Sequence, residues 1–586
     1  MKLYICVINH FLKKTMVNSM KDYSEWKLVL DYEHESEWVD PNRPWLKHRN
    51  PQVPKSIQFD PIPVHEFIRL QISKYPNNIC VYHKPTDRKY TYRELLHYAD
   101  RIANALHELG VGKGDAVGIM SGNCPEFLFC YLGILETGAI LVPINPLLVE
   151  SDVTHIVRES GNIKVIFAHK ANYETVKKAR NQVEVEHLIL IATDEAKEGT
   201  ITLDELINGK PAKRPDVDID PFNDIAALLF TGGTTGLPKG VMLTHYNIVA
   251  AALSGIYNTD QPIEEGFGTG VSLSILPLCH AMGFEFLIVF FHYASMMVMF
   301  SFNPTEVLED IEYYQLTSFW GVPVMYQMLI NSPDFTERDL SSLETAGCGS
   351  AALAPELAKK WEKVVGLKIS QGYGLTETSA FSHGSAGWLP EIRSESVGVP
   401  LMNTDAIIVN PDTLEELKQG EVGEILIRGP QVMKGYWKRP VATKKDLVNG
   451  WLRTGDLGRI DKEGYFYIEG RTKDMIKYKS YKIMSREVEE KLMEHPAILE
   501  VGVVGVPDPN IGETIKAFIV LKKDYQDKGI TARDIVEWSK ERMAGYKYPR
   551  QVEFIKILPR TAVGKIFRRK LREMDVEKQE EQVAPL

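Results

Sequence analysis

Helical and strand patterns alternate along most of this chain, and this alternation restricts the fold more than any other feature of the sequence. Residues 91–94 have the form of a capping box, and apolar residues then recur with helical spacing as far as Leu106. A continuous apolar stretch at 116–120 indicates a buried strand, 125–135 a helix and 139–144 a second buried strand. This repeated order predicts an α/β fold with parallel sheets.

The pattern changes twice towards the C-terminus. Between about residues 398 and 470, short strands are separated by glycine-rich turns, which predicts a β-rich subdomain. The last part of the chain combines helices and strands again and predicts a separate small α+β domain. We therefore expect an N-terminal extension (1–50), a large domain (51–472, with layered α/β subdomains at about 51–215 and 221–400 and the β-rich one at 401–472), a small domain (473–575) and a tail (576–586).

Composition excludes several classes of protein. A chain of 586 residues, 44% hydrophobic and 25% charged, fits neither a disordered chain, a fibrous repeat nor a small disulfide-linked domain. A net charge of −10 disfavours nonspecific binding to nucleic acid, so no nucleic-acid partner is expected. The six cysteines form no CxxC pair and predict buried thiols in a reducing compartment, which favours a cytoplasmic protein.

Two apolar stretches bear on export and membrane insertion. Residues 3–8 are too short an apolar run for an export signal, and Met16 and Met20 offer alternative starts. The uncharged stretch 286–302 contains His292 and is a little short for a membrane span. We therefore favour a buried helix running into a buried strand there, and expect no transmembrane segment.

The segment 228–240, LLFTGGTTGLPKG, is the most informative for function. A buried strand runs into a loop whose glycines free the backbone N–H groups to face an anion, while threonine hydroxyls and one lysine add further donors. A Walker A loop is excluded because Pro238 precedes Lys239 and Gly240 follows it. We predict a phosphate-binding loop made of Thr231, Gly232, Gly233, Thr234, Thr235, Gly236 and Lys239.

With this loop and the motifs described below, which occur in the same order, the chain resembles the adenylate-forming acyl-CoA synthetases from about residue 60 to residue 570. The resemblance is to the medium- and long-chain fatty-acid ligases of that family. It implies the adenylate-forming fold, in which a small mobile C-terminal domain follows the large one. It also implies that a small carboxylic acid, ATP and coenzyme A are the substrates and that Mg²⁺ accompanies ATP.

Four motifs resemble the nucleotide site of the family. In QGYGLTET, Tyr373 offers an aromatic face to adenine, Thr376 would bond the α-phosphate, and Glu377 would bind Mg²⁺ together with Thr231. In WLRTGD, Asp456 is suited to accept both ribose hydroxyls. The resemblance adds Gly349, Ser350 and Ala351 against adenine, Gln371, Gly372 and Gly374 in the motif around Tyr373, and Ile468 and Arg471 beside the ribose.

Other motifs resemble the acid-binding side of the family. His280, in PLCHAMG, would lie near the carboxylate at the entrance of the acyl pocket. Acetyl-specific relatives carry Trp at the position of Gly374, so glycine there indicates an acid larger than acetate. The acyl pocket is predicted to include Phe284, Trp320, Gly321 and Gly374.

The C-terminal motifs imply two half-reactions. Lys473 stands at the family's hinge, and Lys565 matches the catalytic lysine that would bridge the acyl carboxylate and the α-phosphate. The loop carrying Lys479, Ser480 and Tyr481 matches the wall of the coenzyme A tunnel. The family usually has Gly where Ser480 stands, and a positive φ there would cost about 1–2 kcal/mol. Ser485, where Pro is common, can cap the next helix.

The sequence thus predicts ATP-dependent activation of a medium- or long-chain fatty acid, with His280, Thr376, Glu377 and Lys565 as catalytic residues. An aryl or branched acid stays open as the substrate. So does an enzyme that stops at the acyl-adenylate because of Ser480. A noncatalytic nucleotide-binding protein is disfavoured because the catalytic groups are present. The sequence leaves open a homodimer and peripheral contact with a membrane.

Overall fold

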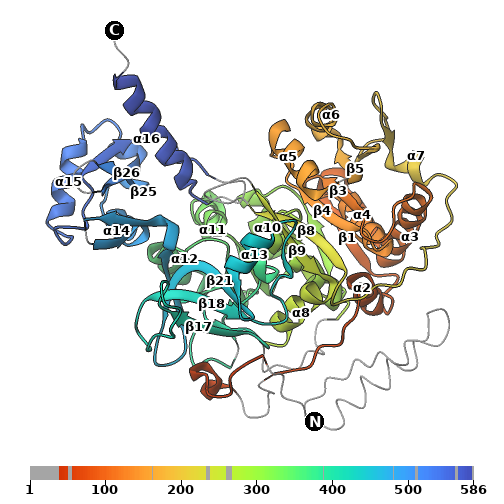
Figure 1. The fold of residues 1–586 in the computed structure, drawn as a ribbon, viewed down its shortest axis with the longest axis horizontal. Helices are drawn as coiled ribbons and strands as arrows, with labels where there is room; N and C mark the ends of the chain where they lie inside the picture. Colours follow the sequence, from red (N-terminus) through yellow and green to blue (C-terminus); the bar gives the residue numbers. More distant parts are fainter. Residues whose placement is uncertain are drawn as a thin grey trace.

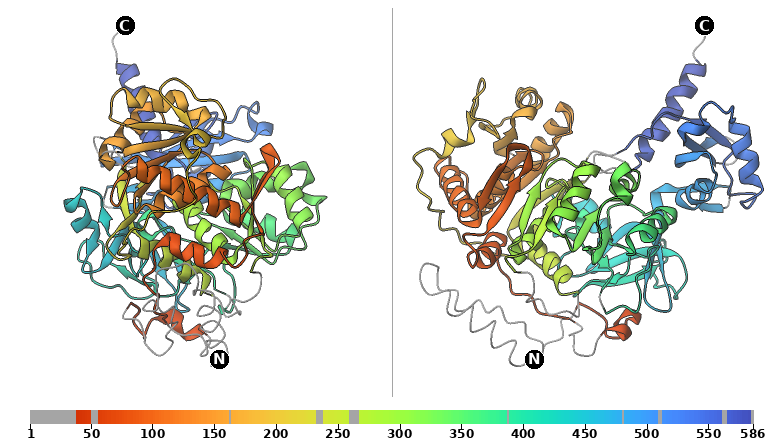
Figure 2. Two further views of the ribbon diagram at one scale, coloured as in Figure 1. Left: turned by 90° about the vertical axis from the view of Figure 1, so that its right-hand side faces the viewer. Right: turned by 180° about the vertical axis from the view of Figure 1, so that it is seen from behind.

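The computed structural model describes residues 38–49, 56–161, 163–231, 238–258, 267–386, 388–479, 481–508, 512–560 and 565–583. Figures 1 and 2 show that the small C-terminal part lies on the opposite side of the molecule from the first α/β layer, with the central and β-rich layers between them. Six sheets carry the strands of the described part of the chain.

The largest sheet has eight strands in the order β19-β9-β8-β4-β3-β5-β6-β7. The strands from β4 to β7 pair in parallel, as expected, whereas β8 and β9 pair antiparallel on either side of the predicted phosphate loop. The strands are β3 (Ala116–Met120), β4 (Ile140–Ile144), β5 (Ile163–His169), β6 (His187–Ile191), β7 (Ile201–Thr202), β8 (Ile225–Thr231), β9 (Lys239–Thr244) and β19 (Gly435–Tyr436). The associated helices are α3 (Tyr92–Glu108), α4 (Pro125–Glu136), α5 (Glu150–Ser160), α6 (Tyr173–Arg180), α7 (Leu203–Ile207) and α8 (His245–Ile256).

Two further sheets make up the central layer, in the orders β10-β11-β1-β2 and β12-β13-β14. Their strands are β1 (Ile79–His83), β2 (Arg88–Thr91), β10 (Val271–Ser274), β11 (Met296–Met299), β12 (Ser318–Gly321), β13 (Thr345–Cys348) and β14 (Ile369–Gln371). The helices are α2 (Val64–Ile72), α9 (Ala281–Tyr293), α10 (Pro304–Tyr314), α11 (Pro323–Ile330) and α12 (Pro355–Val365). The uncharged stretch 286–302 is thus a helix followed by a strand, and no described helix is long and apolar enough to cross a membrane.

The β-rich region is built on a five-stranded antiparallel sheet that includes the long hairpin of β21 and β22. Its strands are β17 (Asp405–Val409), β18 (Gly423–Arg428), β20 (Leu447–Val448), β21 (Trp451–Ile460) and β22 (Phe466–Arg471); β15 (His383–Gly384) pairs with β16 (Val399–Pro400), and α13 (Pro440–Asp446) precedes β20.

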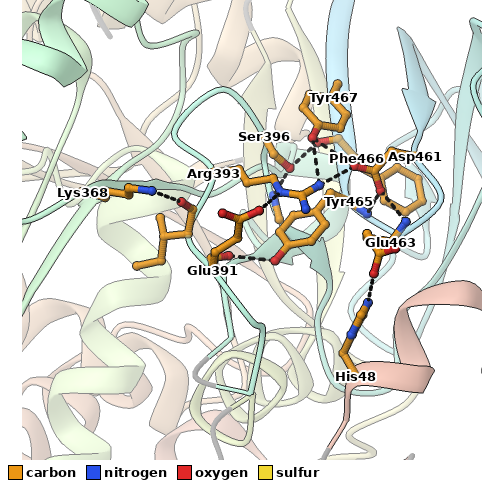
Figure 3. A network of polar contacts seen from close by, with 12 residues as sticks. His48, Lys368, Glu391, Arg393, Ser396, Asp461, Glu463, Tyr465, Phe466 and Tyr467 are labelled. Atoms are coloured by element: carbon orange, nitrogen blue, oxygen red, sulfur yellow. Dashed lines mark hydrogen bonds and ion pairs between the residues drawn. The ribbon is translucent and has the colours of Figure 1, made fainter.

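A network of polar contacts holds the turn of the β21–β22 hairpin (Figure 3). The Arg393 guanidinium lies 2.6 Å from Asp461 and 2.7 Å from Glu391, and stacks 4.0 Å from the ring centroid of Tyr465. The Tyr465 hydroxyl donates to the backbone oxygen of Glu391 at 2.7 Å. The network anchors a hairpin whose opposite end carries Asp456 and Arg471 in register.

The small C-terminal sheet begins at Met475, two residues after Lys473. It contains β23 (Met475–Tyr478), β24 (Tyr481–Met484), β25 (Ile498–Asp508), β26 (Gly512–Leu521) and β27 (Gln551–Phe554), with helices α14 (Ser485–Met493), α15 (Ala532–Lys540) and α16 (Arg568–Val583). The core of this sheet is separate from the cores of the large region.

Candidate active site

One large cleft of about 2810 Å³ brings together motifs that lie far apart in the sequence. It is lined by the central layer, by the β21–β22 hairpin and by the segment of the small domain that carries Lys565. Of the predicted site residues, the structure places Thr231, Lys239, His280, Trp320, Gly349, Ser350, Ala351, Gln371, Gly372, Tyr373, Gly374, Thr376, Glu377, Asp456, Ile468, Arg471, Lys473 and Lys565 along this cleft. The predictions for Gly232, Gly233, Thr234, Thr235, Gly236 and Ser480 lie outside the described residues.

At one end of the cleft, the buried Asp456 carboxylate is held by two partners. The Tyr373 hydroxyl donates to Oδ2 at 2.7 Å, and the Arg471 guanidinium lies 2.9 Å from Oδ1. Burial, together with the Asp456 charge, raises the pKa of Tyr373, so its hydroxyl stays protonated and remains a donor. The result is a rigid carboxylate placed to accept bonds from a polar ligand.

Glu377 stands in a second polar group, which includes two residues that the sequence did not reveal. The Tyr436 hydroxyl donates to Oε1 of Glu377 at 2.9 Å. The Lys239 ammonium lies 3.7 Å from the ring centroid of Tyr436 and 3.6 Å from the Asp446 carboxylate. Sequence reasoning missed Tyr436 and Asp446 because β19 has two residues and α13 seven, too few to show a pattern.

Lys565 and His280 both line the cleft, and the charge of Lys565 acts on His280. Burial and the neighbouring Arg471 lower the pKa of Lys565 to about 8, although Asp456 and Glu377 act in the opposite direction. Burial and the charge of Lys565 lower the pKa of His280 to about 4. At neutral pH, therefore, Lys565 carries a positive charge and His280 is a neutral hydrogen-bonding group.

An apolar stripe leads away from His280 along α9. Met282, Phe286, Val289, Phe290 and Tyr293 all line the cleft, and their spacing places them on one face of the helix. The Phe286 ring lies 5.8 Å from Trp320 and 5.5 Å from Phe381. Trp320 is 39% exposed and covers Gly347, where a Cβ atom would lie 2.1 Å from its ring. One wall of the cleft is thus aromatic and apolar.

Two of the residues predicted for the acyl pocket lie elsewhere. Phe284 is 0% exposed and packs against Tyr131 at 5.2 Å, so it belongs to the core; Phe286, two residues on, lines the cleft instead. Residues two apart point to different sides of a helix, so the two rings cannot both face the cleft. Gly321 is buried, and a Cβ there would meet Phe319 at 3.2 Å rather than the cleft.

Gly374 lines the cleft, but its lack of a side chain has a local cause. A Cβ atom at this position would lie 1.8 Å from the carbonyl oxygen of Ala380. The turn between Tyr373 and His383, whose backbones bond each other at 3.0 and 2.9 Å, therefore requires glycine. Gly374 alone is therefore not evidence for a large acyl pocket; the apolar side chains of α9 that line the cleft are.

The structure also describes residues at or next to the positions where the sequence departs from the family pattern. Ser350 has a φ of 67°, in the left-handed region that favours glycine. Lys479 has a φ of 55° and, with Tyr481, lies outside the lining of the cleft; the Tyr481 ring stacks on Tyr546 at 4.1 Å. Ser485 does not cap α14 as expected: it is the first residue of the helix, and its hydroxyl donates to the backbone oxygen of Asp474 at 2.8 Å.

The fold is that of an adenylate-forming enzyme, as comparison with known proteins shows. The AMP-binding enzyme family matches residues 68–437, and the AMP-binding enzyme C-terminal domain matches residues 487–565. The chain belongs to this family, among its AMP-forming acid–thiol ligases. Enzymes of this family use ATP and coenzyme A.

Relatives and solved structures agree with this assignment. The long-chain-fatty-acid–CoA ligase of Bacillus subtilis (strain 168) is 35% identical over 561 residues, which cover 91% of this chain and 98% of the relative. The 4-coumarate–CoA ligase 2 of Solanum tuberosum is 32% identical, covering 87% and 93%. The structure of ATP-bound MatB from Rhodopseudomonas palustris matches with a TM-score of 0.79 and 26% identity, covering 88% and 99%. The anthranilate CoA ligase AuaEII in complex with anthranoyl-AMP matches with a TM-score of 0.78 and 28% identity, covering 89% and 98%.

Proposed function

We propose that this protein is a medium- to long-chain fatty-acid–CoA ligase that works through an acyl-adenylate. The observation that carries the proposal is the apolar stripe on α9, which begins next to His280 and lines the cleft along the length of the helix. From Met282 to Tyr293 the helix rises about 16 Å at 1.5 Å per residue, far more than acetate needs. The fatty-acid ligases among the relatives support the same substrate class.

In the first half-reaction, a carboxylate oxygen of the acid attacks the α-phosphorus of ATP. The bond from the α-phosphorus to the bridging oxygen breaks, and pyrophosphate leaves with the electron pair. Lys565 holds its positive charge where negative charge develops on the carboxylate and phosphate oxygens, with Thr376 as a hydroxyl donor. Asp456 and Arg471 orient the ribose, and neutral His280 orients the carboxylate.

The residues of the site suit Mg²⁺ bound mainly by the phosphates of ATP. The described residues contain no cluster of three or more His, Cys, Asp or Glu side chains that could hold a metal by themselves. A single carboxylate from Glu377 with the hydroxyl of Thr231 fits a cation that keeps water and phosphate oxygens as its other ligands. When bound, Mg²⁺ would neutralise phosphate charge.

In the second half-reaction, the thiol of coenzyme A loses its proton to solvent and its sulfur attacks the acyl carbon. The acyl–oxygen bond to AMP breaks and AMP leaves with the electron pair. We infer that the domain 473–575 rotates at Lys473, so that the loop with Lys479, Ser480 and Tyr481 replaces the Lys565 loop at the site. The proposed domain boundaries remain those predicted from the sequence.

The test is to incubate the protein with Mg-ATP and acids from acetate to palmitate, plus one aryl acid, with and without coenzyme A. We expect AMP and acyl-CoA to form in equal amounts, with the highest kcat/KM for medium or long chains. A preference for the aryl acid would support the alternative substrate class. Pyrophosphate release without acyl-CoA would mean that the enzyme stops at the adenylate.

Replacing Phe286 with alanine tests the apolar wall. Because this ring contacts Trp320 and Phe381 within the cleft, its loss is expected to lower kcat/KM for the preferred fatty acid about tenfold and to favour bulkier acids. Phe284→Ala is the matched control, since its ring lies in the core. It should lower the free energy of unfolding by about 3–5 kcal/mol without changing the order of preference among acids. The reverse pattern would contradict the assignment of the wall.

A further inference from the structure

Tyr436 connects the two polar parts of the site that would face the triphosphate. On one side its short strand pairs with β9, the strand that begins at Lys239, and Trp437 N–H donates to the Gly240 oxygen at 2.8 Å. On the other side, Met433 N–H donates to the backbone oxygen of Glu377 at 2.9 Å. The segment 433–437 is therefore bonded both to the strand after the phosphate loop and to the backbone of Glu377, the candidate metal ligand.

The Tyr436 side chain repeats this connection. It is 5% exposed, its hydroxyl donates to Oε1 of Glu377 at 2.9 Å, and its ring lies beneath the Lys239 ammonium at 3.7 Å. The Tyr436 backbone N–H donates in turn to the Thr443 hydroxyl oxygen at 2.9 Å, so the side chain starts from an anchored backbone. One buried ring thus touches both the anionic and the cationic group.

We propose that Tyr436 is a positioning residue that orients the Glu377 carboxylate towards the metal of Mg-ATP and keeps Lys239 beside it. The inference rests on the proposed function, in which Glu377 binds Mg²⁺. A hydrogen bond to Oε1 restricts rotation of the carboxylate and leaves Oε2 for the cation. The ring attracts the Lys239 ammonium through its face and holds a phosphate-binding charge next to the metal ligand.

Tyr436→Phe removes the hydrogen bond and keeps the ring beneath Lys239. Binding of a nonhydrolysable ATP analogue, measured by calorimetry, is expected to weaken about tenfold in Mg²⁺ and to stay within twofold of wild type in EDTA. The Mg²⁺ concentration for half-maximal acid-dependent pyrophosphate–ATP exchange should rise by about the same factor. Equal weakening with and without metal, or no change in either, would overturn the proposal.

Tyr465→Phe is the matched control. Tyr465 is 0% exposed and its hydroxyl also makes one partly buried bond, to Glu391, but it lies in the network of Arg393, outside the lining of the cleft (Figure 3). It should leave the metal dependence of binding and exchange unchanged, even if its melting temperature falls as far as that of Tyr436→Phe. An equal shift of metal dependence in both variants would mean a merely structural effect.

A double-mutant cycle with Glu377→Gln separates positioning from folding. Because the proposed effect passes through the carboxylate, Tyr436→Phe should change metal-dependent binding by less than twofold once Glu377 is glutamine. An undiminished effect would contradict the proposal. If wild type binds the analogue in a metal-dependent way but shows no acid-dependent exchange, the proposed function fails while the role of Tyr436 stands.

Discussion

Replacing Lys565 with alanine is expected to slow acyl-adenylate formation by about 10²–10³-fold, because it removes a charge aimed at the developing negative charge of the transition state. The loss should appear in acid-dependent pyrophosphate–ATP exchange. Formation of acyl-CoA from supplied acyl-adenylate and coenzyme A should stay within a few-fold of wild type, since that step does not use Lys565. Lys570→Ala is the control, because that half-exposed lysine on α16 forms ion pairs with Glu573 and Glu577 on its own helix. Loss of both half-reactions in Lys565→Ala would contradict the assigned role.

The lowered pKa of Lys565 also predicts that the rate of adenylation depends on pH. With its pKa lowered to about 8 by burial and by Arg471, the Lys565 ammonium is charged below that pH and loses its proton above it. The rate of adenylation, measured without coenzyme A, should therefore fall as the pH rises through about 8. In Lys565→Arg the guanidinium stays charged, so this alkaline fall should disappear even if the rate is lower. An unchanged alkaline fall would mean that another group titrates.

Asp456→Asn is expected to have the second largest effect. The neutral amide loses the ion pair with Arg471 and leaves the Tyr373 hydroxyl with a weaker acceptor. We expect the KM for ATP to rise about 10–100-fold, and the free energy of unfolding to fall by about 1–3 kcal/mol. Because the Asp456 charge supports the charged form of Lys565, the alkaline fall in rate should also move to lower pH. ATP kinetics, urea unfolding and the pH profile measure the three effects.

Asp405→Asn is the control that separates the effect of Asp456→Asn on ATP binding from its effect on stability. Asp405 is also a buried carboxylate, paired with Arg43 at 2.7 Å and with Arg428 at 3.2 Å, but it lies outside the lining of the cleft. It should lower stability by a comparable amount and leave both the KM for ATP and the pH profile as in wild type. If both variants raise the KM for ATP equally, the effect of Asp456→Asn is structural.

Local patterns in the sequence were enough to predict many of the helices and strands and the class of enzyme. The capping box at Thr91 and the helical spacing after it correspond to α3, and the stretch 286–302 to the end of α9 followed by β11. These features are predictable because hydrogen bonding and side-chain periodicity within a helix or strand depend on neighbours in the chain. The spaced motifs led in the same way to the AMP-binding enzymes, because each contains residues whose chemistry suits one part of the reaction.

The features of the site that could not be predicted from the sequence depend on packing between distant segments. Periodicity separates Phe284 from Phe286 but does not say which side of α9 faces the core, since both sides are apolar. Glycine is needed at 374 because of the Ala380 carbonyl. The pKa of Lys565 is lowered by burial and by Arg471, which belongs to the large domain and lies about ninety residues earlier in the chain. Tyr436 reaches Glu377 from 59 positions along the chain. Contacts of this kind leave no mark in local pattern, because the residues that make them meet through the tertiary fold alone.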